Sequence, residues 1–251
     1  MSYGRTMDAS NAGLDAAGCA AAIAPELDRL RLTVADRVKG PGLAVAAAHG
    51  IEAPAMMIAA YLRNVYPDRP FDPHGVLAVF TYQSVDQAQA GLDALVATGH
   101  LSAVTPTAFE LTASGRSLLH DVVRAGDRVA ADLWSAAPGL DAITSLAERA
   151  VAAIDDGGDT VAVMAPSIGN PAGHSRAGWF SELLTALRFH RFDSHIAAWQ
   201  AAGLTLEQIK NLGPGPERDA IEADTNRRAA TPYRALTSAE REHLLAGLAS
   251  L

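Results

Sequence analysis

The side chains best suited to chemistry in this sequence lie close together, in a proline-free stretch that runs from Trp179 to Gly203. It contains His190, Asp193 and His195. In a helix His190 and Asp193 share a face, and they could form an acid–base pair or part of a metal site. If the protein is an enzyme, we expect all three side chains to be its catalytic residues. The alternative for His190 and Asp193 is a structural hydrogen bond inside a helical bundle.

The spacing of these residues does not favour a metal site. His190 and His195 lie five positions apart, which places them about 140° apart around a helix. A helical zinc site instead offers histidines at i and i+4 with a third ligand. The single Cys19 excludes an intramolecular disulfide and a cysteine-based zinc site, and it fits a reducing compartment. The sequence therefore predicts no metal and identifies no cofactor.

The same region offers groups that could bind a small, planar or anionic molecule. Arg188 and Arg191 could hold an anion by bidentate contacts, or they could pair with Glu222 and Asp224 of a neighbouring helix. Trp199 could stack on a planar ligand or belong to the core. The irregular segment 166–178 is of the kind that often forms a pocket rim. The candidate ligand-binding residues are Arg188, His190, Arg191, His195, Trp199, His174, Arg176 and Tyr233.

The stretch that carries these groups should be a helix enclosed by other helices. It has two apolar stripes on nearly opposite sides, whereas a surface helix needs only one. Charged side chains in a buried helix are costly unless they are paired or face a ligand. We therefore predict that this helix is the centre of the C-terminal half and one wall of a pocket. The stripes are Phe189, Phe192, Ile196 and Trp199 on one side and Phe180, Leu183, Leu184 and Leu187 on the other.

Composition points to a mainly α protein. Of the 251 residues 49% are hydrophobic and only 6% aromatic, and the formal net charge is −8. The N-terminus lacks the features of a signal peptide, and no apolar run approaches the roughly 18 residues of a membrane span. We therefore expect a cytoplasmic protein that does not interact with membranes.

Capping residues, prolines and glycines divide the chain into short elements. We expect a tail over 1–24, a winged-helix domain over 25–134 and a helical ligand-binding or dimerisation domain over 135–251. Gly40-Pro41-Gly42 should end a helix that begins at Pro25. Predicted helices cover 25–39, 43–49, 53–66, 74–82, 84–98, 113–134, 140–154, 179–203, 205–212, 217–230 and a last segment from 238, and predicted strands cover 101–104, 108–111 and 160–164.

Residues 84–119 carry the most specific pattern. A helix closed by Gly-His-Leu precedes a small hairpin, and the run FELTASGRSLL then enters a long helix. Over 25–134 this pattern resembles the winged helix-turn-helix of the MarR-type regulators. The resemblance implies a winged helix, made of helices and a small β-hairpin wing, followed by an α-helical domain. It also implies transcription regulation through double-stranded DNA and a homodimer that buries the terminal helices. The candidate DNA-binding residues are Gln83, Ser84, Gln87, Gln89 and Arg116.

The distribution of charge opposes DNA binding. Phosphate contacts from Lys and Arg supply most non-specific affinity, yet 84–98 contains neither and holds Asp86 and Asp93. Residues 1–134 carry 10 Lys and Arg against 14 Asp and Glu, a net charge of −4. Two functions therefore stay open. One is a ligand-responsive winged-helix regulator that senses a small molecule in a C-terminal helical pocket. The other is an enzyme or carrier that uses the winged helix only as a scaffold.

Overall fold

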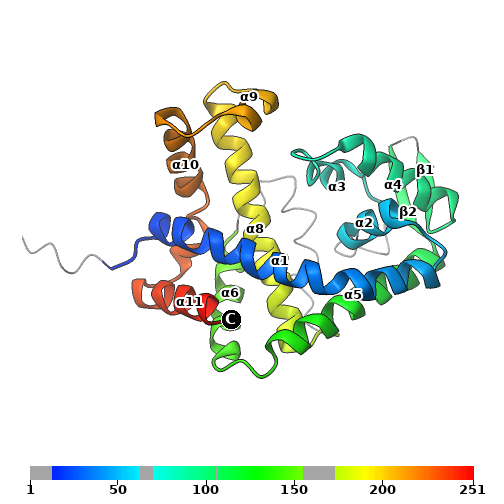
Figure 1. The fold of residues 1–251 in the computed structure, drawn as a ribbon, viewed down its shortest axis with the longest axis horizontal. Helices are drawn as coiled ribbons and strands as arrows, with labels where there is room; N and C mark the ends of the chain where they lie inside the picture. The colour runs from blue at the N-terminus through cyan, green and yellow to red at the C-terminus, as the bar shows by residue number, and fades with distance from the viewer. Residues whose placement is uncertain (1–12, 63–69, 106, 155–172) are drawn as a thin grey trace, which may run out of the picture.

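The protein is mainly helical, with one small two-stranded antiparallel sheet (Figure 1). The computed structural model describes residues 13–62, 70–105, 107–154 and 173–251, and every structural statement below concerns these ranges. Their elements are α1 (Ala16–Ala48), α2 (Ala53–Leu62), α3 (His74–Ala78), α4 (Val85–Ala97), β1 (Leu101–Thr105), β2 (Ala108–Leu111), α5 (Ala113–Trp134), α6 (Leu140–Ala152), α8 (Arg176–Ala201), α9 (Leu206–Asn211), α10 (Pro216–Arg228), the 3-10 helix η1 (Pro232–Ala235) and α11 (Ser238–Ser250).

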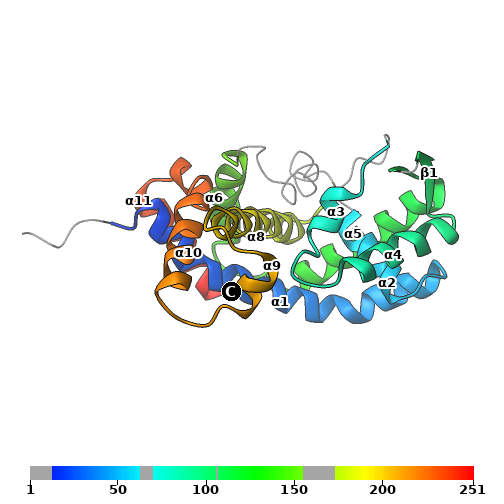
Figure 2. The same cartoon turned by 90° about the horizontal axis from the view of Figure 1, so that it is seen from above.

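The elements form two lobes joined by two long helices. The hairpin lobe consists of α2, α3, α4, β1, β2 and the first half of α5, and the α8 lobe consists of α6, α8, α9, α10, η1 and α11 (Figure 1). Helices α1 and α5 pack against each other. Figure 2 shows α1 extending from α11 and α10 at one end to α2 at the other. Each lobe has its own buried core, and α1 and α5 contribute residues to both cores.

Helix α1 is longer than the sequence predicted. It begins at Ala16 rather than Pro25, where Asp15 accepts a hydrogen bond from the backbone of Gly18, and it continues through Pro41 to Ala48. An internal proline removes a backbone hydrogen bond and costs about 3 kcal/mol. Burial along the helix offsets this cost, since its side chains enter both cores. The prediction that 1–24 is a tail and that Gly40-Pro41-Gly42 ends the helix is therefore wrong for residues 16–48.

Most other local predictions hold. Ser84, Thr112 and Thr205 each accept a hydrogen bond at the start of the predicted helix, and the two strands of the hairpin pair as expected. The helix from His74 ends at Ala78 instead of Tyr82, and a turn leads from there to Ser84. The strand predicted over 160–164 and the end of the helix predicted over 53–66 lie outside the described residues.

The hairpin lobe has a regular order of elements. Helix α2 is followed by an extended residue, Phe71, then by α3, α4 and the β1–β2 hairpin. Phe71 pairs with Phe109 of β2 in an antiparallel bridge, and Phe109 pairs on its other side with Ala103 of β1. The hairpin therefore has a third, very short extended partner from earlier in the chain. Helix α4 packs against α2.

Helix α8 is the centre of its lobe, as predicted. It packs against α10, α6, α5 and α1, and Trp179, Phe180, Leu183 and Leu187 are buried in the core of the α8 lobe. Its Phe189 belongs instead to the core of the hairpin lobe. The segment expected to be irregular up to residue 178 becomes helical at Arg176, with Ser175 as the N-cap.

Within the described ranges no single helix is both long and apolar enough to cross a membrane. Helices α1 and α2 meet that criterion only when they are taken together, and they are bent by 105° at the break between them.

The close packing of α4 on α2 gives a test of the fold. A Cβ atom added at Gly91 of α4 would lie 2.5 Å from the carbonyl oxygen of Pro54 and 2.6 Å from Cγ1 of Ile58. Gly91→Ala should therefore lower the free energy of unfolding by about 1–3 kcal/mol, because overlap outweighs the gain in helix propensity. Gly126→Ala in α5 is the matched control: nothing lies within 4 Å of the added Cβ, so it should stabilise by about 0.5–1 kcal/mol. Urea titration measures both changes, and equal effects would contradict the packing described.

Candidate functional site

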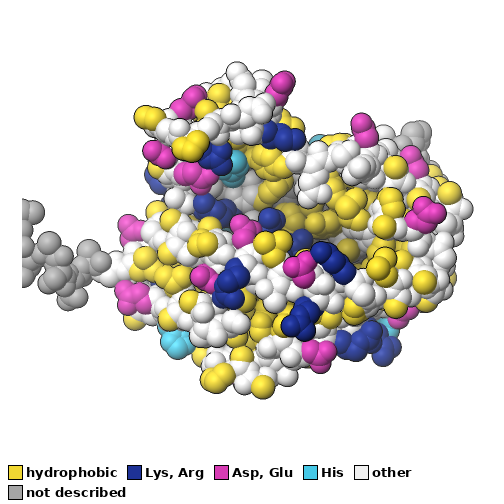
Figure 3. Space-filling model, in the orientation of Figure 1, with side chains coloured by type: hydrophobic (Ala, Val, Ile, Leu, Met, Phe, Trp, Pro, Cys, Tyr) yellow, Lys and Arg dark blue, Asp and Glu magenta, His cyan; other side chains and the backbone are white. Residues whose placement is uncertain are grey.

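A cavity of about 490 Å³ lies where the two lobes meet, with walls from α1, α2, α5 and α8. Figure 3 shows the molecule hollowed between the lobes, with hydrophobic side chains gathered in the hollow. This volume is typical of sites for small organic molecules. The lining residues include Arg31, Val34, Val38 and Lys39 of α1, Met56, Met57 and Tyr61 of α2, Val122 and Val123 of α5, and Glu182, Leu184 and Thr185 of α8.

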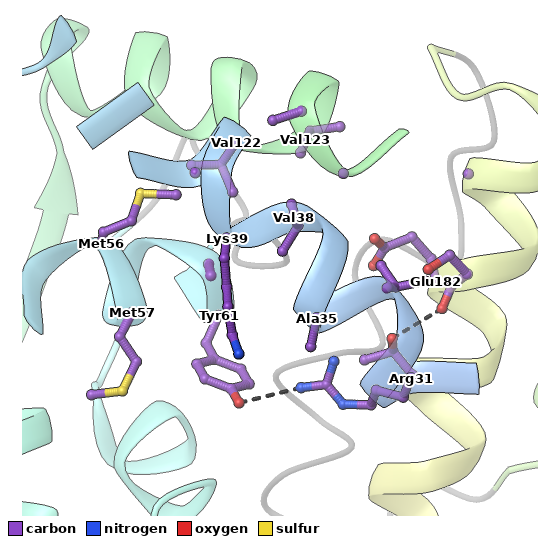
Figure 4. A pocket seen from close by; sticks show the side chains of 18 of the residues that line it. Arg31, Ala35, Val38, Lys39, Met56, Met57, Tyr61, Val122, Val123 and Glu182 are labelled. Carbon is purple, nitrogen blue, oxygen red and sulfur yellow. Dashed lines mark hydrogen bonds between the residues drawn. The ribbon is translucent and has the colours of Figure 1, made fainter. Parts of the chain in front are cut away.

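The walls of this cavity are largely apolar, and two of their polar side chains contact each other. Arg31 and Tyr61 approach each other across the space between α1 and α2 (Figure 4), and the guanidinium donates to the phenol oxygen at 3.3 Å. The same guanidinium lies over the ring of Phe189 at 5.7 Å. Met56 and Met57 supply flexible, polarisable surface that adapts to different shapes. The cavity therefore fits a mainly apolar molecule with a few hydrogen-bonding atoms.

The candidate ligand-binding residues lie outside this cavity. Arg191 donates to the side chains of Asn226 and Glu222 at 2.7 and 3.2 Å, which confirms the predicted pairing with Glu222. Arg188 does not pair with α10. It donates to Asp28 of α1 at 2.8 Å. Asp224, its other predicted partner, instead pairs with Arg227 and Arg228 of its own helix.

Three further candidates take part in structural contacts of the α8 lobe. Arg176 donates to Glu148 at 2.6 Å, and Glu148 also accepts from the indole N–H of Trp179. His174 Nδ1 lies 3.6 Å from an oxygen of Asp127, which caps the turn before α8 by accepting from the backbone of Ser175. Burial raises the pKa of Tyr233, which belongs to the core of this lobe. His174 and Arg176 hold the beginning of α8 in place.

Of the proposed catalytic residues, His195 has the most distinctive surroundings. Its Nδ1 lies 2.8 Å from the hydroxyl of Tyr82, in the turn between α3 and α4. The phenol oxygen also accepts a hydrogen bond of 2.6 Å from the indole N–H of Trp199. On its other side, His195 Nε2 lies 3.8 Å from Glu222 of α10. We call Tyr82, His195 and Trp199 the Tyr82 clasp. His190 and Asp193 are partly buried on the same helix, away from the cavity.

The surroundings of His195 and Tyr82 determine which atoms of the clasp carry protons. Burial lowers the pKa of His195 from 6.5; Glu222 acts in the opposite direction, and Arg191 and Arg218 lower the pKa further. Burial also raises the pKa of Tyr82. At neutral pH the imidazole is therefore neutral and the phenol is protonated. Tyr82 donates to Nδ1, and the remaining imidazole proton sits on Nε2, towards Glu222.

Sequence reasoning found His195 and Trp199 but not Tyr82. Tyr82 lies 113 positions before His195 and ends a short apolar run. The local sequence predicts only a turn and the capped helix that starts at Ser84, and neither feature marks Tyr82 as a functional residue. Its one usable signal was an aromatic side chain with a polar tip at the end of a helix, where such groups usually need a partner when they are buried.

Four of the candidate DNA-binding residues lie at or near the start of α4, whereas Arg116 lies in α5, beside the end of β2. Ser84 is engaged as the N-cap, with its hydroxyl 3.2 Å from the backbone N–H of Gln87. Gln89 donates to Asp93 at 3.0 Å, and Arg116 donates to the carbonyl of Leu111 at 2.7 Å. The side chains of Gln83, Gln87 and Gln89 are exposed. Helix α4 therefore presents amides and carboxylates rather than cations.

Comparisons with models of protein families, with curated proteins and with solved structures find no match to this chain. Within the described ranges, no group of three or more His, Cys, Asp or Glu side chains could hold a metal ion.

The cavity can be tested by filling it. Met57→Trp adds a bulky side chain to its wall and should weaken the binding of an apolar fluorescent probe such as anilinonaphthalene sulfonate by at least about tenfold. Leu32→Trp is the matched control, because Leu32 is 63% exposed and does not line the cavity. Probe titration measures both affinities. Equal affinity in the two variants would mean that the probe binds elsewhere.

Proposed function

We propose that the protein is a ligand-responsive winged-helix transcriptional regulator, in which a small, mainly apolar molecule binds between the two lobes. The observation that carries this proposal is the cavity itself, whose walls come from α1, α2, α5 and α8. A ligand that contacts both lobes binds one relative position of the lobes better than another. Such a difference in affinity is what a ligand needs to shift a conformational equilibrium. The ligand site thus lies at the lobe boundary rather than within the C-terminal half.

The order of elements in the hairpin lobe supports the winged-helix part of the proposal. A helix, a short extended segment, two helices and a β-hairpin follow one another, and the extended segment pairs with the hairpin through Phe71 and Phe109. In this assignment α4 is the recognition helix and β1–β2 is the wing. A homodimer would present two such helices to two half-sites, and we include that homodimer in the proposal.

The chemistry of α4 favours recognition through base edges. Gln87 and Gln89 are exposed on it, and amide side chains pair with adenine in the major groove. Because α4 carries Asp86 and Asp93 and no Lys or Arg, phosphate attraction must come from other elements or from the partner of a dimer. We therefore expect lower non-specific affinity than for a basic recognition helix.

Binding of the purified protein to the DNA upstream of its own gene, across a salt series, tests the regulator. Affinity should fall as salt rises, with a slope of about −0.9 for each phosphate contacted. Gln87→Ala should weaken binding to the specific site by about 1–3 kcal/mol and leave non-specific binding unchanged. Gln200→Ala, exposed at the far end of α8, is the control. Absence of binding at low salt, with and without ligand, would overturn the regulator.

A second candidate function is an enzyme or carrier that acts on the bound small molecule by acid–base chemistry. The hydrogen bond between Tyr82 and His195 favours it, because an imidazole whose Nδ1 accepts from the phenol can act as a general base towards that phenol. Because His195 lies outside the cavity, the enzyme needs a small molecule that reaches Tyr82 and His195. Such a molecule should be chemically altered by the wild type, and the rate should fall by about 10²–10⁴ in His195→Ala. Mass spectrometry of the recovered ligand checks this. An unaltered ligand would exclude the enzyme as a function and leave the carrier.

A further inference from the structure

We infer that Tyr82 is a positioning residue: the Tyr82 clasp fixes the turn between α3 and α4 against α8, and protonation of His195 opens it. The inference deepens the proposed function and rests on it in one respect, since it takes α4 as the element whose position matters. It adds a regulatory input, pH, to the same boundary between the lobes that the ligand occupies.

The clasp is a link between parts of the chain that have few other contacts. Among the described elements, neither α3 nor α4 packs extensively against α8. Tyr82 spans this gap with two short hydrogen bonds, of 2.8 Å to His195 and 2.6 Å from Trp199. Its ring also meets Phe192 edge-to-face at 5.2 Å. Because the turn runs directly into the N-cap of α4 at Ser84, the position of Tyr82 sets where α4 begins.

A series of ring contacts joins the clasp to the cavity. Phe192 meets Phe189 with a centroid separation of 6.0 Å, and Phe189 meets Tyr61 at 6.1 Å. Tyr61 lines the cavity. A ligand that displaces Tyr61 therefore acts on packed rings that end at Tyr82. Packed rings in edge contact resist continuous deformation, so a shift at one end favours a discrete rearrangement.

The clasp requires a neutral imidazole. The phenol oxygen accepts from Trp199, and the phenol proton goes to Nδ1 of His195. Once Nδ1 is protonated it becomes a donor aimed at the phenol, and the phenol proton loses its acceptor in a partly buried site. The charged and titratable groups that face His195 are Tyr82, Arg191 of α8, and Glu222 and Arg218 of α10. Glu222 attracts the proton, whereas burial and the two arginines oppose it.

The direction of the pH dependence follows from the lowered pKa of His195. The unfolded value is 6.5, and the folded value lies below it. The clasp is therefore intact above pH 6.5, and its contribution is lost as the pH falls through the folded pKa. Acidification should loosen the α3–α4 turn before it unfolds the protein.

The experiment is a distance measurement between spin labels on the two lobes of the full-length protein. Ala90→Cys on α4 and Gln200→Cys on α8 are exposed labelling positions. Cys19 can remain, because it is buried and burial raises the pKa of its thiol to about 12. The wild type should give one narrow distance distribution at about pH 8 and a broader or shifted one at a second pH below the lowered pKa of His195, found by titrating the distances downward from pH 6.5. Tyr82→Phe should give the broad distribution at both pH values.

Two further variants distinguish loss of the hydrogen bonds of the clasp from a general loosening of the structure. His195→Asn places an oxygen acceptor close to the position of Nδ1 and does not titrate, so its distribution should stay narrow at both pH values. Tyr61→Phe removes another phenol, which bonds to Arg31 and not to the clasp, and it should respond to pH as the wild type does. A narrow distribution in Tyr82→Phe at about pH 8, opening of His195→Asn at the lower pH, or a wild type that stays narrow until it unfolds would overturn the inference. If Tyr82→Phe fails to fold, the comparison of the distance distributions of His195→Asn and the wild type still tests the inference.

The same proteins distinguish this inference from the proposed function, because the distances are measured without DNA. Opening as expected, with about tenfold weaker DNA binding in Tyr82→Phe at about pH 8, supports both. Opening as expected without DNA binding at any salt concentration supports the clasp and removes the regulator. DNA binding with distances that do not depend on Tyr82 or pH supports the regulator and removes the clasp.

Discussion

The constraint on which this structure depends is the burial of α8, a helix with apolar side chains on nearly opposite faces. Such a helix cannot lie on a surface, so other elements must enclose it. Helices α6 and α10 do so within the α8 lobe, and α1 and α5 reach it while they extend into the hairpin lobe. Phe189 of α8 enters the core of the hairpin lobe. Enclosing one helix from both lobes creates the boundary at which the cavity and the Tyr82 clasp lie.

The charges of α8 are accommodated by partners from distant parts of the chain. Arg188 bonds to Asp28 of α1, and Arg191 bonds to Glu222 of α10. These pairs are partly exposed, and such ion pairs contribute about 0–1 kcal/mol. They offset the cost of removing charge from water rather than stabilise the fold strongly. Of the two ways to accommodate charge in a buried helix, pairing and contact with a ligand, the two arginines use pairing, because carboxylates lie beside both of them.

Local signals in the sequence predicted much of the fold. Features that depend on residues far apart in the chain were not predicted. The caps at Ser84 and Thr112, the hairpin and the central helix each depend on neighbouring residues. Helix α1 was divided wrongly, because Pro25 and Pro41 break isolated helices but can be tolerated when tertiary burial is large. The prediction that the central helix forms one wall of a pocket holds, since α8 lines the cavity, but the walls from α1, α2 and α5 were missed because each of them, taken alone, is an ordinary apolar helix face. The existence of the cavity depends on how four helices meet.

The lack of cations on α4 makes its orientation more important for the proposed function. A basic recognition helix is held near DNA by phosphate attraction, which tolerates imprecise placement. If α4 is the recognition helix, as we propose, it must rely on directional hydrogen bonds from exposed amides such as Gln87, and these require close geometry. In that role a small rotation of α4 would weaken these hydrogen bonds. In the proposed regulator, a ligand in the cavity and a proton on His195 would both act where such a rotation begins, so neither would need to move the lobes far to control binding.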